Sequence, residues 1–257
     1  MFQINPWITG MYRPKGNQPS LYCLPHAGGN SENYLNWQSD LIDDLYMKAI
    51  VFPGCGRRHN EEHISNINEL ITELTSVIEQ DCEGEFYIFG HSMGAILAWE
   101  IAKKIRKKPS GLLLSASLTP SEIPSPRILR MADMNNESFI KEIKFFNGLD
   151  ENILSNPFIS EIIADKLKRD FKLISQYRYF PTGKVDIPIM AIVGHEDAHV
   201  PAKKMLQWQG YTNNFLGLRA VDGNHFYFNE HPEAVVDAIN SMVKESREKI
   251  GHYPIII

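Results

Sequence analysis

The sequence predicts an α/β domain, in which helices cover a mostly parallel central sheet. Short apolar runs typical of buried strands alternate with stretches of helical periodicity, and this alternation encodes a parallel sheet with crossover helices. A chain of 257 residues is long enough for one large α/β domain and short for two. Hydrophobic residues make up 43% and charged residues 22%, which is close to the average for a globular protein.

The first three predicted strands lie within residues 21–89. Apolar runs at 21–24 and 48–52 each end at a proline, and a third run at 86–89 leads into a glycine-containing turn. A short helical pattern lies at 34–41. Between the second and third strands, an apolar stripe at helical spacing predicts an amphipathic helix that packs on the core. Its members are Ile67, Leu70, Ile71, Leu74 and Ile78.

The rest of the chain contributes three further strands, predicted at 112–116, 189–193 and 218–221. A last helix begins near Pro232, where the missing N–H of a proline costs nothing. The alternation is interrupted between about residues 119 and 186, a stretch with four prolines and helical patterns but no strong strand. We therefore predict a helical insertion that forms a lid over the carboxyl edge of the sheet.

The composition excludes several classes of function. A net charge of −5 argues against a nucleic-acid-binding surface, and the basic run at 103–108 is best explained as the end of a helix. Three widely spaced cysteines, Cys23, Cys55 and Cys82, suggest neither disulfides nor a zinc site. No secretory signal and no membrane-spanning run is readable. We expect a cytoplasmic protein that binds neither nucleic acid nor membrane.

A candidate nucleophile lies in the segment Gly90-His91-Ser92-Met93-Gly94, which matches G-x-S-x-G. The small residues allow a sharp turn that presents the serine hydroxyl above a sheet. The pattern alone is short, but here an apolar strand precedes it and an amphipathic helix follows it. This is the strand–turn–helix setting of the nucleophile in the α/β-hydrolase fold, so we predict that fold with Ser92 as nucleophile.

A serine nucleophile needs a base, and the base needs an orienting acid. In this fold the acid and then the histidine follow the serine along the chain. Asp197, directly after the strand at 189–193, is the predicted acid, with its neighbour Glu196 as a possible substitute. His225, in a loop before the last helix, is the predicted base. His199 is too close to Asp197 in the sequence to accept its carboxylate well.

Acyl transfer also needs hydrogen-bond donors at the developing oxyanion. One is expected to be the backbone N–H of Met93, directly after the nucleophile, and the other the N–H of Ala27 in the loop after the first strand. Gly28 and Gly29 would keep that loop open and close to the substrate. His26 can bond a loop carbonyl or contact the acyl chain, and the structural role is the simpler interpretation.

Together these motifs resemble the type II thioesterases that accompany nonribosomal peptide and polyketide synthetases. The likeness runs nearly end to end and rests on LYCLPHAGGNSENYLNW, VFPGCGRRHNEE, GHSMG, IMAIVGHEDAHVP and GNHFYF. Two departures are visible. Cys55 stands where the family loop PGRG usually has its basic residue, and Asn30 follows HAGG where serine or threonine is commoner. Both are expected near the entrance, where they bear on carrier or chain-length preference.

The resemblance implies hydrolysis of acyl, aminoacyl or peptidyl thioesters held on the phosphopantetheine arm of a carrier protein domain. Such enzymes clear misprimed synthetases in antibiotic or siderophore-type biosynthesis. It also implies that Ser92, Asp197 and His225 form the triad, that Ala27 and Met93 supply the oxyanion hole, and that no metal or cofactor is needed.

The acyl group is expected to contact Gly28, His26 and apolar side chains of the lid. For any single lid residue, packing on the core is the simpler interpretation; the candidates are Phe139, Ile143, Phe146, Leu149 and Phe158. Three alternatives stay open: a carboxylesterase or lipase acting on small esters, a cyclising or transferring thioesterase, and a catalytically inactive binding module. A monomer is the expected state, although the sequence contains no feature that specifies it.

Overall fold

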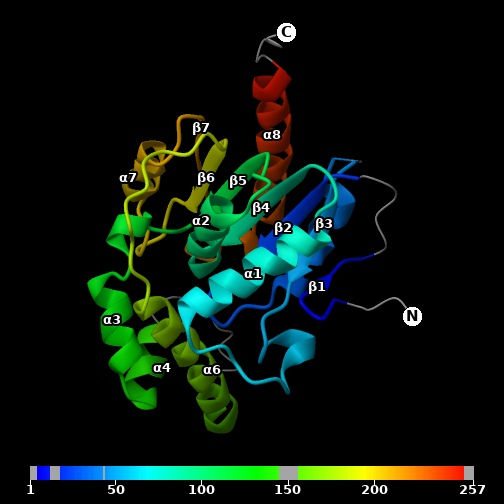
Figure 1. The fold of residues 1–257 in the computed structure, drawn as a ribbon. Helices are drawn as coiled ribbons and strands as arrows, with labels where there is room; N and C mark the ends of the chain where they lie inside the picture. The colour runs from blue at the N-terminus through cyan, green and yellow to red at the C-terminus, as the bar shows by residue number, and fades with distance from the viewer. Residues whose placement is uncertain (1–4, 12–17, 43, 145–155, 252–257) are drawn as a thin grey trace.

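A central sheet of seven strands is formed by the described part of the chain, residues 5–11, 18–42, 44–144 and 156–251 of the computed structural model (Figure 1). The strand order is β1-β3-β2-β4-β5-β6-β7. The strands are β1 (Ile8–Thr9), β2 (Ser20–Leu24), β3 (Tyr46–Ile50), β4 (Phe86–His91), β5 (Gly111–Ser115), β6 (Ile189–Gly194) and β7 (Phe215–Val221). The short β1 pairs antiparallel with β3, and every other pairing is parallel. The predicted mostly parallel sheet is confirmed, and β1 is an addition that the sequence pattern did not indicate.

Helices cover both faces of the sheet, as a parallel sheet requires. On one face α1 (Ile67–Asp81) packs on α2 (Met93–Lys104), which contacts β2, β4 and β5. On the other face α8 (Pro232–Gly251) contacts β5, β6 and β7 and also touches the 3₁₀ helix η1 (Ser31–Asp40). The helical pattern predicted at 34–41 corresponds to η1, which is a 3₁₀ helix.

Two hydrophobic cores result, one on each face of the sheet. Side chains alternate along a strand, so Tyr22 and Leu24 of β2 enter the core under α1 and α2, whereas Leu21 and Cys23 enter the core under α8. All four side chains are fully buried. Because both faces are covered, the strands appear in the sequence as continuous apolar runs.

The described residues between β5 and β6 are mostly helical, in agreement with the helical insertion predicted at 119–186. It contains the 3₁₀ helix η3 (Pro120–Glu122) and the helices α3 (Pro126–Asp133), α4 (Asn136–Lys144) and α6 (Pro157–Ser175). α6 packs on α3 and α4, and the three helices lie together beyond one end of the sheet (Figure 1). This insertion therefore forms a small layer of its own, with a separate core around Met131 and Phe139.

The shorter elements are the 3₁₀ helices η2 (Gly56–Arg58), η4 (Leu206–Gly210) and η5 (Tyr227–Asn229) and the helix α7 (Ala202–Met205). Cys23, Cys55 and Cys82 are free thiols. Among the described residues, no helix combines the length and apolar character that crossing a bilayer demands.

Candidate active site

Ser92 occupies a sharp turn between β4 and α2. Its backbone angles, φ 54° and ψ −114°, are strained for a residue with a side chain, and its N–H donates to the Ser115 carbonyl at 2.8 Å. Gly90 and Gly94 flank the turn, and both must be glycine because backbone atoms lie too close to leave room for a side chain. A Cβ on Gly90 would lie 2.2 Å from the Gly94 carbonyl oxygen, and a Cβ on Gly94 would lie 2.4 Å from the carbonyl oxygen of Leu24. The turn thus matches the predicted geometry of a nucleophile.

Asp197 lies in the loop after β6 and His225 in the loop after β7, and their side chains form a buried pair. His225 Nδ1 lies 2.7 Å from Asp197 Oδ2, and the two residues are 8% and 4% exposed. Gly194 lets their loops meet, because a Cβ there would lie 2.3 Å from the Gly223 and Asn224 carbonyl oxygens. Since Nδ1 faces the carboxylate, Nε2 is the ring nitrogen left to act on a substrate or a hydroxyl.

The electrostatics of Asp197 favour the carboxylate form. Burial alone raises its pKa, but the hydrogen bond and charge of His225 and the N–H groups of Val200 and His199 outweigh burial, so the pKa lies below the ordinary value. The two N–H groups both donate to Oδ1, at 2.9 and 2.8 Å. Glu196, the alternative acid, is exposed. The geometry therefore singles out Asp197 over its neighbour.

The histidines other than His225 are placed differently. The ring of His199 is hydrogen-bonded to the guanidinium of Arg127 at the start of α3. Burial, followed by the charges of Arg127 and His225, lowers the pKa of His199 to about 4, so that its ring is neutral at pH 7. His231 is half-exposed and lies 3.2 Å from Glu233. His252 lies outside the described residues.

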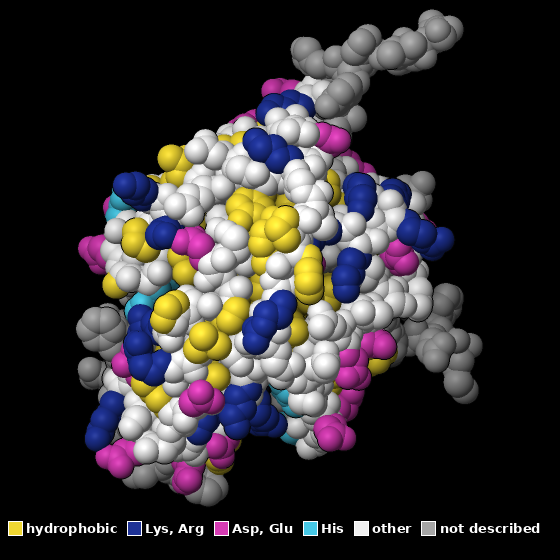
Figure 2. Space-filling view, turned by 60° about the vertical axis from the view of Figure 1, so that its left-hand side comes forward, with side chains coloured by type: hydrophobic (Ala, Val, Ile, Leu, Met, Phe, Trp, Pro, Cys, Tyr) yellow, Lys and Arg dark blue, Asp and Glu magenta, His cyan; other side chains and the backbone are white. Residues whose placement is uncertain are grey.

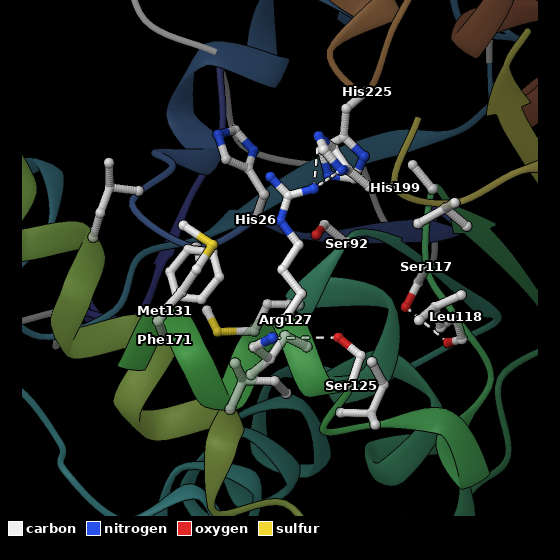
Figure 3. A pocket seen from close by; sticks show the side chains of 18 of the residues that line it. His26, Ser92, Ser117, Leu118, Ser125, Arg127, Met131, Phe171, His199 and His225 are labelled. Carbon is white, nitrogen blue, oxygen red and sulfur yellow. Dashed lines mark hydrogen bonds between the residues drawn. The ribbon is translucent and has the colours of Figure 1, made fainter. Parts of the chain in front are cut away.

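A cavity of about 530 Å³ brings these groups together. Ser92 and His225 line its inner end, and Arg127 crosses it from the insertion, as Figure 3 shows. Most of the remaining wall is apolar and comes from α2, α3, α4 and α6; it includes Ile96, Ile128, Met131, Ile143, Ile163, Leu167, Phe171 and Ile174. An apolar chamber with a few polar groups at one end suits an acyl chain whose carbonyl lies at Ser92.

The two residues predicted to supply the oxyanion donors both line the cavity. Met93 directly follows Ser92 as the first residue of α2, and Ala27 belongs to the loop after β2. Gly28 has a φ of +72°, which favours glycine, and a Cβ there would also lie 2.2 Å from the Leu167 side chain of α6. The glycine lets the insertion close directly on this loop.

His26 lines the cavity but is also bound to the protein. Its Nδ1 lies 3.3 Å from the Tyr34 hydroxyl, and burial, with the charges of His225 and Lys166, lowers its pKa to about 3. A neutral ring held in this way fits the structural role and leaves one edge to contact a substrate. Beneath it, His91 is fully buried with Nδ1 2.7 Å from the Ser115 hydroxyl.

The predicted lid residues have separate positions. Ile143 lines the cavity, whereas Phe139 is fully buried in the core of the insertion, against Phe171. Phe139 therefore packs the insertion and does not form the cavity wall. Phe146 and Leu149 lie outside the described residues, as does the side chain of Phe158.

Two contacts between the insertion and the catalytic end escaped sequence reasoning. Asp170 of α6 accepts a hydrogen bond from the Gly28 N–H at 2.6 Å, and Arg127 of α3 reaches His199 on the Asp197 loop. A signal for Asp170 was present: Ile163, Leu167, Phe171 and Ile174 form one apolar stripe, and Asp170 falls on the same face. A carboxylate on a buried stripe indicates a specific partner.

The two departures from the family pattern lie near the same loops. Cys55 is 4% exposed, and burial and then the Asp170 carboxylate raise its pKa, while Lys166 opposes them. Cys55 is therefore buried close to Asp170 and is not an entrance residue. Asn30 caps η1, accepting the Glu32 N–H at 3.1 Å. Among the described residues, no group of three or more His, Cys, Asp or Glu side chains is arranged to hold a metal ion.

Comparisons with known proteins point to one family. The thioesterase domain family matches residues 19–243. The thioesterase PikA5 of Streptomyces venezuelae is 28% identical over 246 residues, which cover 94% of this chain and 86% of that protein. The gramicidin S biosynthesis protein GrsT of Aneurinibacillus migulanus is 26% identical over 239 residues, covering 91% and 93%.

A solved structure, the type II thioesterase BorB from the borrelidin biosynthetic cluster, is similar with a TM-score of 0.83 and 27% identity, covering 96% of this chain and all of that one. The resemblance to type II thioesterases is thereby confirmed, together with the α/β-hydrolase fold. Since the family match spans most of the sequence, the chain belongs to the thioesterase family.

Proposed function

We propose that this protein is a serine thioesterase that releases acyl, aminoacyl or peptidyl groups from the phosphopantetheine arm of carrier protein domains. The observation that carries the proposal is the buried Asp197–His225 pair, whose histidine lines one apolar cavity together with Ser92 at its strained turn. Membership of the thioesterase family supports thioesters as the substrate class. Relatives named for gramicidin S and anguibactin biosynthesis support a role beside a synthetase.

In the first step His225 Nε2 takes the proton of the Ser92 hydroxyl while Oγ attacks the thioester carbonyl. The N–H groups of Ala27 and Met93 stabilise the oxyanion, and Asp197 holds the imidazole in the tautomer that leaves Nε2 free. The carbon–sulfur bond then breaks. The pantetheine thiol has a pKa of about 8.5, so it leaves readily and takes the proton from His225.

The second step returns the serine. His225 removes a proton from water, the hydroxide attacks the acyl–Ser92 ester, and the tetrahedral intermediate collapses to free acid as the proton passes to Ser92 Oγ. Each cycle consumes one thioester and one water and yields one acid and one thiol. These are the roles that we assign to Ser92, Asp197 and His225.

The insertion serves as the lid in this proposal. It roofs the cavity with α3, α4 and α6, so an acyl chain tethered to a large carrier needs the roof to move before it can reach Ser92. Apolar side chains of the roof, among them Ile143 and Leu167, would contact the acyl chain. Contact of the acyl chain with Phe146 and Phe158 remains part of the proposal.

The outer face of the lid is a suitable surface for the carrier. Leu129 of α3 and Ile159 and Ile162 of α6 are 45%, 41% and 53% exposed, and we propose that these apolar side chains contact the carrier. On the side of the molecule shown in Figure 2, hydrophobic side chains lie among both basic and acidic ones. A monomeric enzyme in the cytoplasm, free of nucleic acid and membrane, is part of the same proposal.

The test is turnover of a panel of acylated carrier domains and matching free acyl thioesters, followed by intact mass. We expect hydrolysis of both, faster for the carrier-bound form, and none with Ser92→Ala. The alternative, a carboxylesterase that acts on small esters, predicts that a short soluble ester is hydrolysed much faster than any carrier thioester. That result would show that the substrates are small esters and not carrier-bound thioesters.

A further inference from the structure

We infer that Asp170 of the lid helix α6 is a positioning residue, which holds the oxyanion loop in its active geometry and so makes catalysis depend on a seated lid. The oxyanion loop is defined here as residues 25–30, between β2 and η1. The inference deepens the proposed function and rests on it, because it assigns the control of the same site.

Asp170 joins three parts of the chain that are far apart in the sequence. Its Oδ2 accepts the Gly28 N–H at 2.6 Å, and its Oδ1 lies 2.8 Å from His63 Nε2, in the segment between η2 and α1. Asp170 is 2% exposed. A carboxylate is costly to bury, so it persists inside a protein where such bonds compensate it. Both oxygens therefore have defined partners.

The bond acts next to the chemistry. The Gly28 N–H belongs to the 27–28 peptide, which is joined through Ala27 Cα to the peptide that carries the Ala27 N–H, the proposed oxyanion donor; a shift of the first peptide is therefore expected to displace that donor. Within the loop, the backbone holds itself through a turn in which the Gly29 N–H donates to the His26 carbonyl at 2.9 Å. Asp170 supplies the side-chain anchor from outside. Catalytic donors tolerate little displacement, because they must meet the oxyanion at hydrogen-bond distance.

The anchor is carried by the element that has to move. Asp170 and Leu167 lie three residues apart on one face of α6, and Leu167 covers Gly28 so closely that a Cβ there would clash. Lifting α6 to admit a tethered acyl chain would withdraw both from the oxyanion loop. Returning α6 would restore the Gly28 bond and the position of the Ala27 N–H. The site is then complete only with the lid closed over its substrate.

A purely structural role for Asp170 makes a different prediction. If the carboxylate only anchors α6, then losing either of its partners should lower stability, and activity should follow stability. His63→Ala removes one partner and keeps the Gly28 bond, whereas Asp170→Ala removes both. Asn at position 170 can still accept the Gly28 N–H through Oδ1 and donate to His63 through Nδ2.

The experiment measures kcat and KM for a small soluble acyl thioester, and the rate of Ser92 labelling by a fluorophosphonate, well below the melting temperature of each variant. We expect Asp170→Ala to lower kcat about 100-fold with KM within about threefold, since removing an oxyanion donor costs roughly 10²–10³ in kcat. Asp170→Asn should recover most of that loss. His63→Ala should lower kcat much less than Asp170→Ala. The matched control is Asp165→Asn, which alters an exposed carboxylate on the same helix, bonded to Asn136, and should change neither constant.

If Asp170→Ala does not fold, Asp170→Leu fills the volume and still leaves Gly28 without its acceptor. A folded Ala or Leu variant with kcat within twofold of wild type overturns the inference, as does an equal loss of kcat in His63→Ala. Failure of the proposed function looks different: wild-type protein would not hydrolyse the thioester at all. The labelling rates would then still test Asp170, since phosphonylation of Ser92 uses the same oxyanion hole.

Discussion

Replacing Asp197 by asparagine tests the orienting role of the acid with almost no change of shape. Two backbone N–H groups, of His199 and Val200, converge on Oδ1. In the variant they require the amide oxygen at that position, which places the amide nitrogen where Oδ2 now faces His225 Nδ1. The amide donates a hydrogen bond there. The imidazole must accept it at Nδ1 and carry its proton on Nε2, which then cannot take the proton of Ser92.

The expected loss follows from the wrong tautomer. In the serine protease triad, the same exchange lowers kcat by about 10⁴. An equal loss here corresponds to about 5 kcal/mol of transition-state stabilisation. KM for a soluble acyl thioester should stay within a few-fold, because Asp197 is buried behind His225 and does not line the cavity.

The assay is steady-state hydrolysis of a free acyl thioester at pH 7, with fluorophosphonate labelling of Ser92 as a second readout. The matched control is Glu196→Gln, which makes the same change of charge at the exposed neighbour and should alter kcat less than twofold. Retention of more than a tenth of wild-type kcat in Asp197→Asn would refute the orienting role. A comparable loss of kcat in Glu196→Gln would show that the orienting role was assigned to the wrong carboxylate.

Three further predictions concern the same site. Ser92→Ala or His225→Ala should lower kcat by several orders of magnitude with an unchanged circular dichroism spectrum, and more than a tenth of the activity left in Ser92→Ala would disprove the nucleophile. Ile143→Ala should shift the preference among acyl chain lengths by about tenfold while barely changing the rate of fluorophosphonate labelling. Equal slowing for acetyl and long-chain thioesters would show that this part of the lid is structural and does not select chain length. Because the folded-state pKa of Asp197 is depressed, ionisation of this side chain stabilises the fold above about pH 4. The wild-type protein should therefore have a higher free energy of unfolding than Asp197→Asn at neutral pH, and this difference should shrink as the pH falls through the folded-state pKa. Chemical denaturation at several pH values measures this difference, and a gap that widens in acid would contradict it.

Much of the fold was predictable because its determinants are local. The buried strands are continuous apolar runs, since helices cover both faces of the sheet. The α1 stripe at 3.6-residue spacing encodes its buried face in the same direct way. The two-residue β1 was missed because so short an edge strand has no period to detect. η1 has helical spacing in the sequence, but its backbone is a 3₁₀ helix.

The residues of the candidate triad were also predictable, because each follows a strand and the order along the chain is constrained. Gly90 and Gly94 mark the strained turn at Ser92, and Gly194 marks the crossing of the Asp197 and His225 loops. In each case a side chain would collide with backbone. Such glycines are visible in the sequence as motifs even before the contact that requires them is known.

By itself, then, the sequence determined the sheet, the thioesterase family and the positions of Ser92, Asp197 and His225 at the ends of strands. Only the tertiary structure decided how the insertion meets them. Asp170 and Gly28 are 142 residues apart, and Arg127 and His199 are 72 apart. Neither pair shares an element or a spacing rule. The partner of a buried carboxylate is chosen by how α6 packs over the oxyanion loop, and that packing is a property of the assembled chain.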